Sequence, residues 1–259
     1  MKKIMTAIFI ISLVLVTAAC SSETVSKSGP AVLTISAASS LKEVLEEIGS
    51  EFQKEYPDIE LRFNLGASGA LKQQIEQGAP ADLFISASPE KYAELVDRDY
   101  IHIGDSIVTN ELVLITAKEA SFEIEQLSDL TKNDIEKIAI GTPDVVPAGT
   151  YAEQALNHEG IYQMLSQKLV LAKDVRQVLR YVETENVQAG FVYKTDALTS
   201  EKVKIAATID AESHAPIKYP AGILDRTEHK TEALLFFEFL KGEKAAKLWT
   251  EYGFDVVNN

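Results

Sequence analysis

Strand patterns and helix patterns alternate along nearly the whole chain, and this alternation constrains the fold more than any other feature of the sequence. From Leu41 to Phe52 the apolar residues stand at offsets 0, 3, 4, 7 and 11, which is one face of a helix. Residues 59–65 alternate apolar and polar, as in a half-buried strand. Such alternation predicts an α/β protein with parallel sheets and helices on both faces of each sheet.

Further segments continue the same alternation. We predict strands at 32–35, 82–86, 112–116, 138–141, 190–193, 203–209 and 221–224. We predict helices at 71–77, 89–96, 147–158 and 175–182, followed by helical patterns between Ala233 and Tyr252. A chain of this length has room for one large domain or two medium ones.

The first nineteen residues have the pattern of a targeting segment. Two lysines precede the apolar run Ile4 to Val16, which is shorter than the roughly 20 residues that a transmembrane helix needs. Small residues then lead into Cys20, as before a signal-peptide cleavage site. We predict a signal peptide over residues 1–19 and a flexible tether over residues 20–29, because the tether is polar and small.

Cys20 is the only cysteine, so the chain can form no internal disulfide. Its place after small residues resembles a bacterial lipobox, although Thr17 stands where Leu or Val is usual. The resemblance implies that Cys20 is lipidated and anchors the protein to the outer face of the cell membrane. The alternative is ordinary secretion with a dispensable cysteine.

Charge and motif content exclude several functions. The chain has 25 basic and 39 acidic residues, and removal of residues 1–19, with two lysines and no acid, changes its net charge from -14 to -16. Nucleic acid is therefore not an expected partner, because binding it requires clustered Lys and Arg. The four histidines show no zinc-ligand spacing, and no phosphate-binding or dinucleotide-binding glycine motif occurs.

Small or hydroxyl residues stand at four predicted helix starts. They are Ser40, Ser68, Ala148 after Pro147, and Val175 after the predicted cap Asp174. Amide groups in the first turn of a helix lack acceptors and carry partial positive charge, so helix starts bind anions. In open α/β sheets these starts gather at the carboxyl ends of the strands, where ligands usually bind.

Each of these residues also has a purely structural interpretation. Ser40 has Glu43 three residues later, which is the pattern of a capping box in which the serine caps its own helix. Ala148 and Val175 carry no side-chain chemistry and suit a core. Tyr193 ends a predicted strand and suits half-buried packing.

Several segments carry the motifs of one known family. In chain order they are Ala37–Leu41, Gly78–Ala87, Val146–Ala152, Asp174–Arg176, Phe191–Tyr193 and Glu251–Phe254. Together they resemble the molybdate-binding component of bacterial molybdate ABC transporters over about residues 32–254. The stretch Gly78–Ala87 is the most specific of these matches.

This resemblance implies a fold and a domain division. The fold would be the two-lobed periplasmic-binding-protein fold of type II, with a mostly parallel sheet flanked by helices in each lobe and the ligand cleft between the lobes. Residues 30–110 plus 219–259 would form lobe 1, and residues 111–218 would form lobe 2. The chain would cross between the lobes twice, and the crossings would act as the hinge.

The resemblance also implies a ligand set and a role. The oxyanion would be held by the hydroxyls of Ser40, Ser68 and Tyr193 and by the backbone N–H groups of Ala148 and Val175, with Ser39 as an additional candidate. The protein would be an extracytoplasmic solute-binding lipoprotein, usually a monomer, that captures molybdate or tungstate for an ABC permease. It would use no cofactor, and molybdenum would enter only as the oxyanion.

The implied ligand set contains hydrogen-bond donors only. Phosphate carries a proton at neutral pH, and a pocket without an acceptor would leave that proton unpaired at a cost of about 1–3 kcal/mol. Molybdate, tungstate and sulfate carry no such proton, so a donor-only pocket favours them.

Three alternatives remain open from the sequence. The same fold could bind sulfate, or a small organic anion if Arg176, which directly follows Val175, reached the cleft. A secreted serine hydrolase using Ser68 is a further alternative. However, Ala70 stands where the G-x-S-x-G pattern requires glycine, and no histidine lies in the matched segments.

Overall fold

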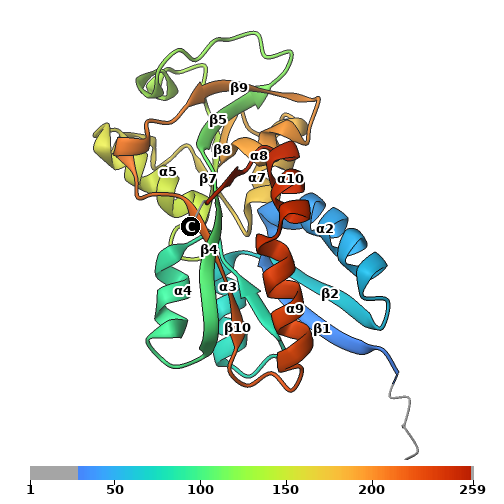
Figure 1. Cartoon of the computed structure of the whole chain (residues 1–259). Helices are drawn as coiled ribbons and strands as arrows, with labels where there is room; N and C mark the ends of the chain where they lie inside the picture. The colour runs from blue at the N-terminus through green and yellow to red at the C-terminus, as the bar shows by residue number, and fades with distance from the viewer. Residues whose placement is uncertain (1–28, 258–259) are drawn as a thin grey trace, which may run out of the picture.

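The computed structural model describes residues 29–257 of the 259-residue chain, and within this range the chain forms two β-sheets flanked by helices (Figure 1). The first sheet has the order β11 (Asp255–Val256), β4 (Ile101–Thr109), β10 (Lys218–Leu224), β3 (Leu83–Ile85), β1 (Ala31–Ala38) and β2 (Ile59–Gly66). The second has the order β7 (Leu169–Ala172), β6 (Ile138–Gly141), β8 (Ala189–Tyr193), β5 (Leu112–Ala117) and β9 (Val203–Thr208). The predicted α/β fold class with two helix-flanked sheets is confirmed.

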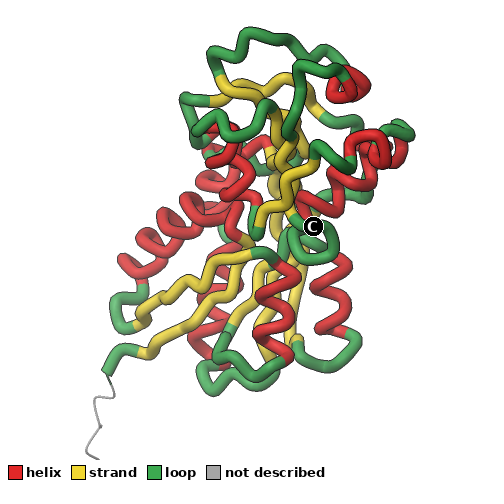
Figure 2. The backbone as a smooth tube through the Cα atoms, turned by 180° about the vertical axis from the view of Figure 1, so that it is seen from behind, coloured by secondary structure: helices red, strands yellow, loops and turns green. Residues whose placement is uncertain are grey.

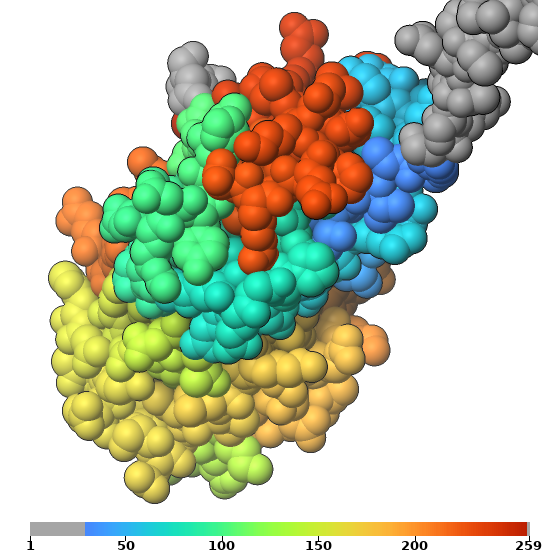
Figure 3. All heavy atoms as spheres, turned by 90° about the horizontal axis from the view of Figure 1, so that it is seen from below, coloured from blue at the N-terminus to red at the C-terminus, as the bar shows by residue number. Residues whose placement is uncertain are grey.

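The first sheet takes its strands from both ends of the described chain, and the second takes them from the middle. We call the part built on the first sheet lobe 1 and the part built on the second sheet lobe 2. Figure 3 shows the blue and orange-red ends of the chain together in lobe 1, with the yellow middle segment in lobe 2. The two crossings, residues 110–111 and 209–217, lie side by side, because the Asn110 N–H donates to the Ile217 carbonyl at 3.2 Å.

Both sheets are mixed, so the prediction of mostly parallel sheets is wrong. β1 pairs in parallel with β2 and β3, and β6 pairs in parallel with β7 and β8. The remaining pairs are antiparallel: β10 with β3 and β4, β11 with β4, and β5 with β8 and β9. For β4 and β10 the reason is the double crossing. The chain leaves lobe 1 along β4 and returns along β10, so these neighbours run in opposite directions.

Helices cover both faces of the lobe 1 sheet, as Figure 2 shows from behind. Lobe 1 holds α2 (Lys42–Glu55), α3 (Ser68–Glu76), α4 (Pro89–Val96), α9 (Lys230–Lys241) and α10 (Glu243–Glu251). Lobe 2 holds α5 (Pro147–His158), α6 (Tyr162–Leu165), α7 (Val175–Glu183) and α8 (Lys194–Leu198). Short 3-10 turns lie at η1 (Ser39–Leu41), η2 (Leu127–Thr131) and η3 (Ala211–Ser213).

Strand β3 shows how one sequence serves two faces of a sheet. Successive side chains of a strand point to opposite faces. Phe84 packs with Leu71 and Leu95 from α3 and α4, whereas Leu83 and Ile85 belong to the main core on the other face. The sheet is therefore buried on both sides at β3. The carboxyl ends of the parallel strands β1, β2 and β3 form the edge that faces lobe 2.

The predicted signal peptide (residues 1–19), Cys20 and most of the predicted tether lie outside the described residues. Between residues 29 and 257, no helix combines the length and apolar character needed to cross a membrane.

Candidate functional site

A small pocket of about 10 Å³ lies between the two lobes. Lobe 1 contributes the residues that directly follow β1, β2 and β3, and lobe 2 contributes the starts of α5 and α7 and the end of β8. All six residues singled out in the sequence line it and are buried: Ser39, Ser40, Ser68, Ala148, Val175 and Tyr193. The fold thus joins positions that lie up to about 150 residues apart in the chain.

Ser40 does not cap its own helix. It lies inside the turn η1, the position before α2 is Leu41, and no side-chain cap bond is formed there. The predicted capping box is therefore wrong, because the 3-10 turn moves the start of α2 past Ser40 and because Glu43 pairs with Arg176 instead. The Ser40 Oγ lies 3.1 Å from the hydroxyl of Tyr219.

Ser68 is the first residue of α3 and is fully buried. Its Oγ accepts the backbone N–H of Ala87, two residues after β3, at 2.9 Å. Because this bond uses an oxygen lone pair and not the proton, the hydroxyl retains its proton for a bound anion.

Lobe 2 supplies two backbone amides. Ala148 is the second residue of α5, which begins at Pro147, and Val175 is the first residue of α7. The predicted cap at Asp174 is confirmed, since its carboxylate accepts the N–H of Gln177 at 2.8 Å. Amides in these positions have no acceptor in their own helix and lie at its positive end.

Tyr193 ends β8 and is 1% exposed. Among the described residues its hydroxyl has no hydrogen-bond partner of ordinary geometry, although its ring packs edge-on against Tyr219 at 5.8 Å between centroids. Burial raises the pKa of the Tyr193 hydroxyl well above its ordinary value, so it stays protonated. A buried hydroxyl without a partner costs about 1–3 kcal/mol, and a ligand that accepts its proton would remove that cost.

Arg176 follows Val175 but does not line the pocket. Its guanidinium pairs with Glu43 of lobe 1 and, through Nε, with the buried Oδ1 of Asp196 at 3.0 Å. Nε also donates to the Ser39 carbonyl at 3.3 Å. The cation that would favour a carboxylate ligand is thus engaged outside the pocket.

The lobes are bonded to each other around the pocket, so the structure is a closed form. The Gly69 N–H of lobe 1 donates to the Val145 carbonyl of lobe 2 at 3.0 Å. The Tyr151 hydroxyl of lobe 2 donates to the Ala87 carbonyl of lobe 1 at 3.2 Å. A Cβ on Gly69 would lie 2.7 Å from the Val145 oxygen, so this approach requires glycine.

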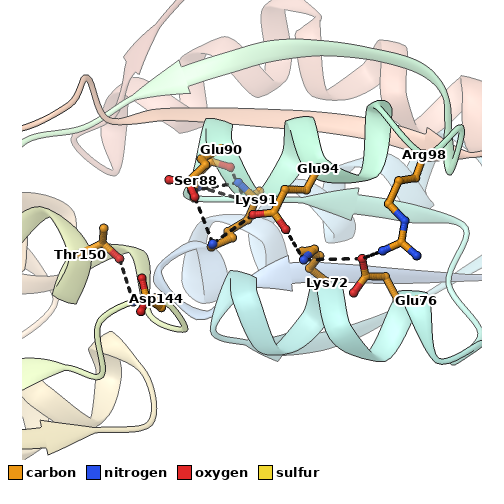
Figure 4. Close-up of polar contacts among 10 residues, drawn as sticks. Lys72, Glu76, Ser88, Glu90, Lys91, Glu94, Arg98, Asp144 and Thr150 are labelled. Atoms are coloured by element: carbon orange, nitrogen blue, oxygen red, sulfur yellow. Dashed lines mark hydrogen bonds and ion pairs between the residues drawn. The ribbon is translucent and has the colours of Figure 1, made fainter.

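A larger pocket, of about 360 Å³, adjoins the first along the same cleft. On its lobe 1 side Lys91 pairs with Glu90 at 3.2 Å and with Glu94 at 3.1 Å (Figure 4). Asp144 lies on its lobe 2 side. The carboxylates of Glu90 and Asp144 line this space alongside Lys91 and Lys218, so it presents acceptors as well as cations. It is therefore the less suitable place for a dianion that only accepts hydrogen bonds.

Metal-ligand clusters are not part of the site. Within residues 29–257, no group of three or more His, Cys, Asp and Glu side chains could hold a metal ion. The smaller pocket has neither an acid nor a histidine among its lining residues.

Known proteins resemble this chain over nearly its whole length. The family model for bacterial extracellular solute-binding proteins matches residues 33–255. YvgL of Bacillus subtilis, which carries the provisional name of an ABC transporter substrate-binding lipoprotein, is 46% identical over 254 residues, covering 96% of this chain and 97% of YvgL. The molybdate-binding protein ModA of Escherichia coli is 35% identical over 230 residues, covering 86% and 89%. The solved structure of the periplasmic molybdate-binding protein of Azotobacter vinelandii has a TM-score of 0.80 and 26% identity, covering 87% of this chain and all of that one.

Proposed function

This chain belongs to the bacterial extracellular solute-binding proteins, and from that premise we propose that it captures molybdate or tungstate for an ABC import transporter. The observation that carries the proposal is the convergence of three hydroxyls and two helix-start amides, from both lobes, on one buried pocket whose lining residues include no charged side chain. Such a donor set suits a small dianion that only accepts hydrogen bonds.

The energy of binding would come from local dipoles. Hydrogen bonds to a charged group contribute about 1.5–3 kcal/mol each. Five such bonds, reduced by the cost of ordering the ligand and closing the lobes, are enough for affinity in the micromolar range or tighter. The net charge of -14 makes this local origin necessary, because the long-range field of the protein repels anions.

The proposed role is binding and not catalysis. A serine nucleophile needs a base within hydrogen-bond reach. The contact made by the Ser68 Oγ is to the Ala87 N–H, and no histidine lines its pocket. The alternative of a serine hydrolase therefore lacks the group that would activate Ser68.

We further propose that residues 1–19 are removed as a signal peptide and that Cys20 is lipidated, which tethers the protein to the outer face of the cell membrane. The name of the 46% identical relative as a lipoprotein supports this. Expression of the full chain with Cys20→Ser should move the protein from the membrane fraction to the medium or the periplasm. Retention in the membrane fraction would contradict the anchor.

The test of the function is isothermal titration of the purified chain, with residues 1–20 removed, against molybdate, tungstate, sulfate and phosphate at neutral pH. We expect one-to-one binding of molybdate and tungstate, with sulfate weaker and phosphate weakest. Absence of heat with all four anions would contradict the proposal. A preference for sulfate would mean that the protein binds sulfate, which also carries no proton, in place of molybdate or tungstate.

A further inference from the structure

A line of hydrogen bonds reaches Ser40 from the two crossings between the lobes. Asn110 lies in the first crossing, between β4 and β5, and Tyr219 lies at the start of β10, just after the second crossing. The Asn110 Nδ2 lies 3.4 Å from the Tyr219 hydroxyl, which lies 3.1 Å from the Ser40 Oγ. Neither Asn110 nor Tyr219 is among the residues that line the pocket.

The orientation of the Asn110 side chain follows from its other contacts. Its Oδ1 accepts the backbone N–H of Glu111 at 2.9 Å, and an N–H donor must meet the oxygen of the amide and not the nitrogen. The Nδ2 therefore faces the other way, toward Tyr219 and toward the Thr195 Oγ1 at 2.9 Å.

This orientation sets the direction of the whole line. An amide nitrogen only donates, so the Tyr219 oxygen accepts from Asn110. Tyr219 is fully buried, and burial raises the pKa of its hydroxyl above the ordinary value, so its single proton is retained. Among the described residues, the Ser40 Oγ is the acceptor that this proton meets with hydrogen-bond geometry. Ser40 then accepts from Tyr219, and its own proton is left to point into the pocket.

We propose that Asn110 and Tyr219 are positioning residues that hold Ser40 as a donor and thereby set the specificity of the pocket against anions that carry a proton. The inference rests on the proposed function, since it concerns the same anion site. Ser68 is held in the same sense, because its oxygen accepts the Ala87 N–H through one lone pair and its proton is left for the pocket. With both serines facing the ligand as donors, a protonated anion such as hydrogen phosphate meets a proton where it needs an acceptor.

The test compares Tyr219→Phe with the wild type for three anions at one pH: molybdate, sulfate and inorganic phosphate. The substitution removes only a hydroxyl and keeps the ring that packs on Tyr193 and Phe254. Without the Tyr219 hydroxyl, the Ser40 hydroxyl can rotate and accept a proton from the ligand. We expect the preference for molybdate over phosphate to narrow about tenfold, which is the low part of the range for one unpaired polar group. The preference for molybdate over sulfate should not change, because neither anion carries a proton.

A second variant reverses the line without removing Tyr219. Asn110→Asp keeps an oxygen for the Glu111 N–H but presents an acceptor to the Tyr219 hydroxyl, which would then turn its proton away from Ser40. The added charge weakens the binding of molybdate and of phosphate alike. Because Ser40 can then accept a proton from phosphate, the ratio of molybdate affinity to phosphate affinity should again narrow. The matched control is Tyr92→Phe, which removes another buried tyrosine hydroxyl of lobe 1, one that donates to the Ala221 carbonyl at 3.2 Å. Tyr92→Phe should leave the relative affinities for molybdate, sulfate and phosphate unchanged.

The outcomes separate the two proposals. Wild-type protein that binds none of the anions overturns the function itself. A different outcome overturns only the role of Asn110 and Tyr219 and leaves the function standing. In that outcome the wild type binds molybdate, but in the variants the molybdate-to-phosphate ratio is unchanged or phosphate binding stays undetectable. An equal change in the sulfate and phosphate ratios also overturns it, because that would be a loss of fit and not of proton discrimination.

Discussion

The guanidinium of Arg176 donates across the cleft to the backbone carbonyl of Ser39, with 3.3 Å between Nε and the oxygen. It is held for this contact inside lobe 2 by the fully buried carboxylate of Asp196, and it pairs with Glu43 at the start of α2 in lobe 1. The segment that carries Ser40 and the helix start that carries Val175 are thus fastened together beside the pocket. The contact stabilises the closed form in which both lobes can reach one ligand.

Replacing Arg176 should therefore shorten the lifetime of the bound state. With Arg176→Gln we expect molybdate to dissociate about tenfold faster, with a smaller change in its association rate, because most of the effect of lost contacts falls on dissociation. Stopped-flow measurement of both rates checks this. Arg180→Gln, on the same helix but exposed, is the control and should behave as wild type. Equal dissociation rates for all three proteins would show that Arg176 does not hold the lobes closed.

Asp196 should make the stability of the ligand-free protein fall as the pH rises. Burial raises its pKa from 3.8 to about 6, even though the Arg176 cation acts to lower it. A carboxyl with a raised pKa in the folded state binds its proton more tightly there than in the unfolded chain. Its contribution to stability is therefore present below pH 3.8 and is lost as the pH rises through 6, by on the order of 3 kcal/mol.

The comparison with Asp196→Asn isolates this contribution, because the amide does not titrate. Urea unfolding of both proteins at pH 4, 5, 6 and 7.5 should show the free energy of the wild type falling relative to the variant across this window. Parallel pH profiles would mean that the carboxyl titrates alike in the folded and unfolded states.

Local sequence was sufficient for elements whose own residues decide their structure. The predicted bounds of α4, α5 and β6 match the structure, since Pro89 and Pro147 begin the two helices and β6 is a short apolar run. The strand β4 was not predicted. Its residues His102 to Gly104 are exposed, so no clear alternation marks it, and it is held by pairing with β10 more than 100 residues later.

The same distinction holds for the pocket. The helix starts at Ala148 and Val175 could be found because Pro147 and Asp174 mark them locally. Asn110 and Tyr219 could not, because they lie 109 residues apart and neither belongs to a motif. Only the pairing of β4 with β10 brings them together beside Ser40. For the same reason the capping pattern at Ser40 was misleading, since the partner of its hydroxyl is 179 residues away.

Gly69→Ala should block closure without harming either lobe. The new Cβ would lie 2.7 Å from the Val145 carbonyl oxygen, while the residue itself sits in α3, where alanine is the better helix former by about 1 kcal/mol. We expect at least tenfold weaker molybdate binding with a melting temperature of the ligand-free protein that is unchanged or slightly higher. Small-angle scattering should show little compaction on adding molybdate.

The matched control for Gly69→Ala is Gly242→Ala. That glycine has an extended backbone, with φ -76° and ψ 166°, which alanine can adopt, and the nearest atom is 3.4 Å from the added Cβ. It lies between α9 and α10, outside the residues that line the pocket. It should bind molybdate as the wild type does. If Gly69→Ala also kept wild-type affinity, the Gly69–Val145 contact would not be part of the closed form that binds.

Tyr193→Phe and Ser68→Ala should both weaken molybdate binding but change the stability of the ligand-free protein in opposite directions. Among residues 29–257 the Tyr193 hydroxyl has no hydrogen-bond partner of ordinary geometry, so its removal should leave the ligand-free protein as stable or more stable by up to about 1–3 kcal/mol, while molybdate binding weakens about tenfold. The Ser68 hydroxyl is bonded to the Ala87 N–H, so its removal should weaken binding and lower stability by about 1 kcal/mol, because that amide loses its acceptor. Thermal unfolding with and without molybdate measures both quantities in one experiment. Loss of stability in ligand-free Tyr193→Phe would indicate that the hydroxyl has a structural partner within the protein, and unchanged molybdate affinity in both variants would remove these two hydroxyls from the proposed site.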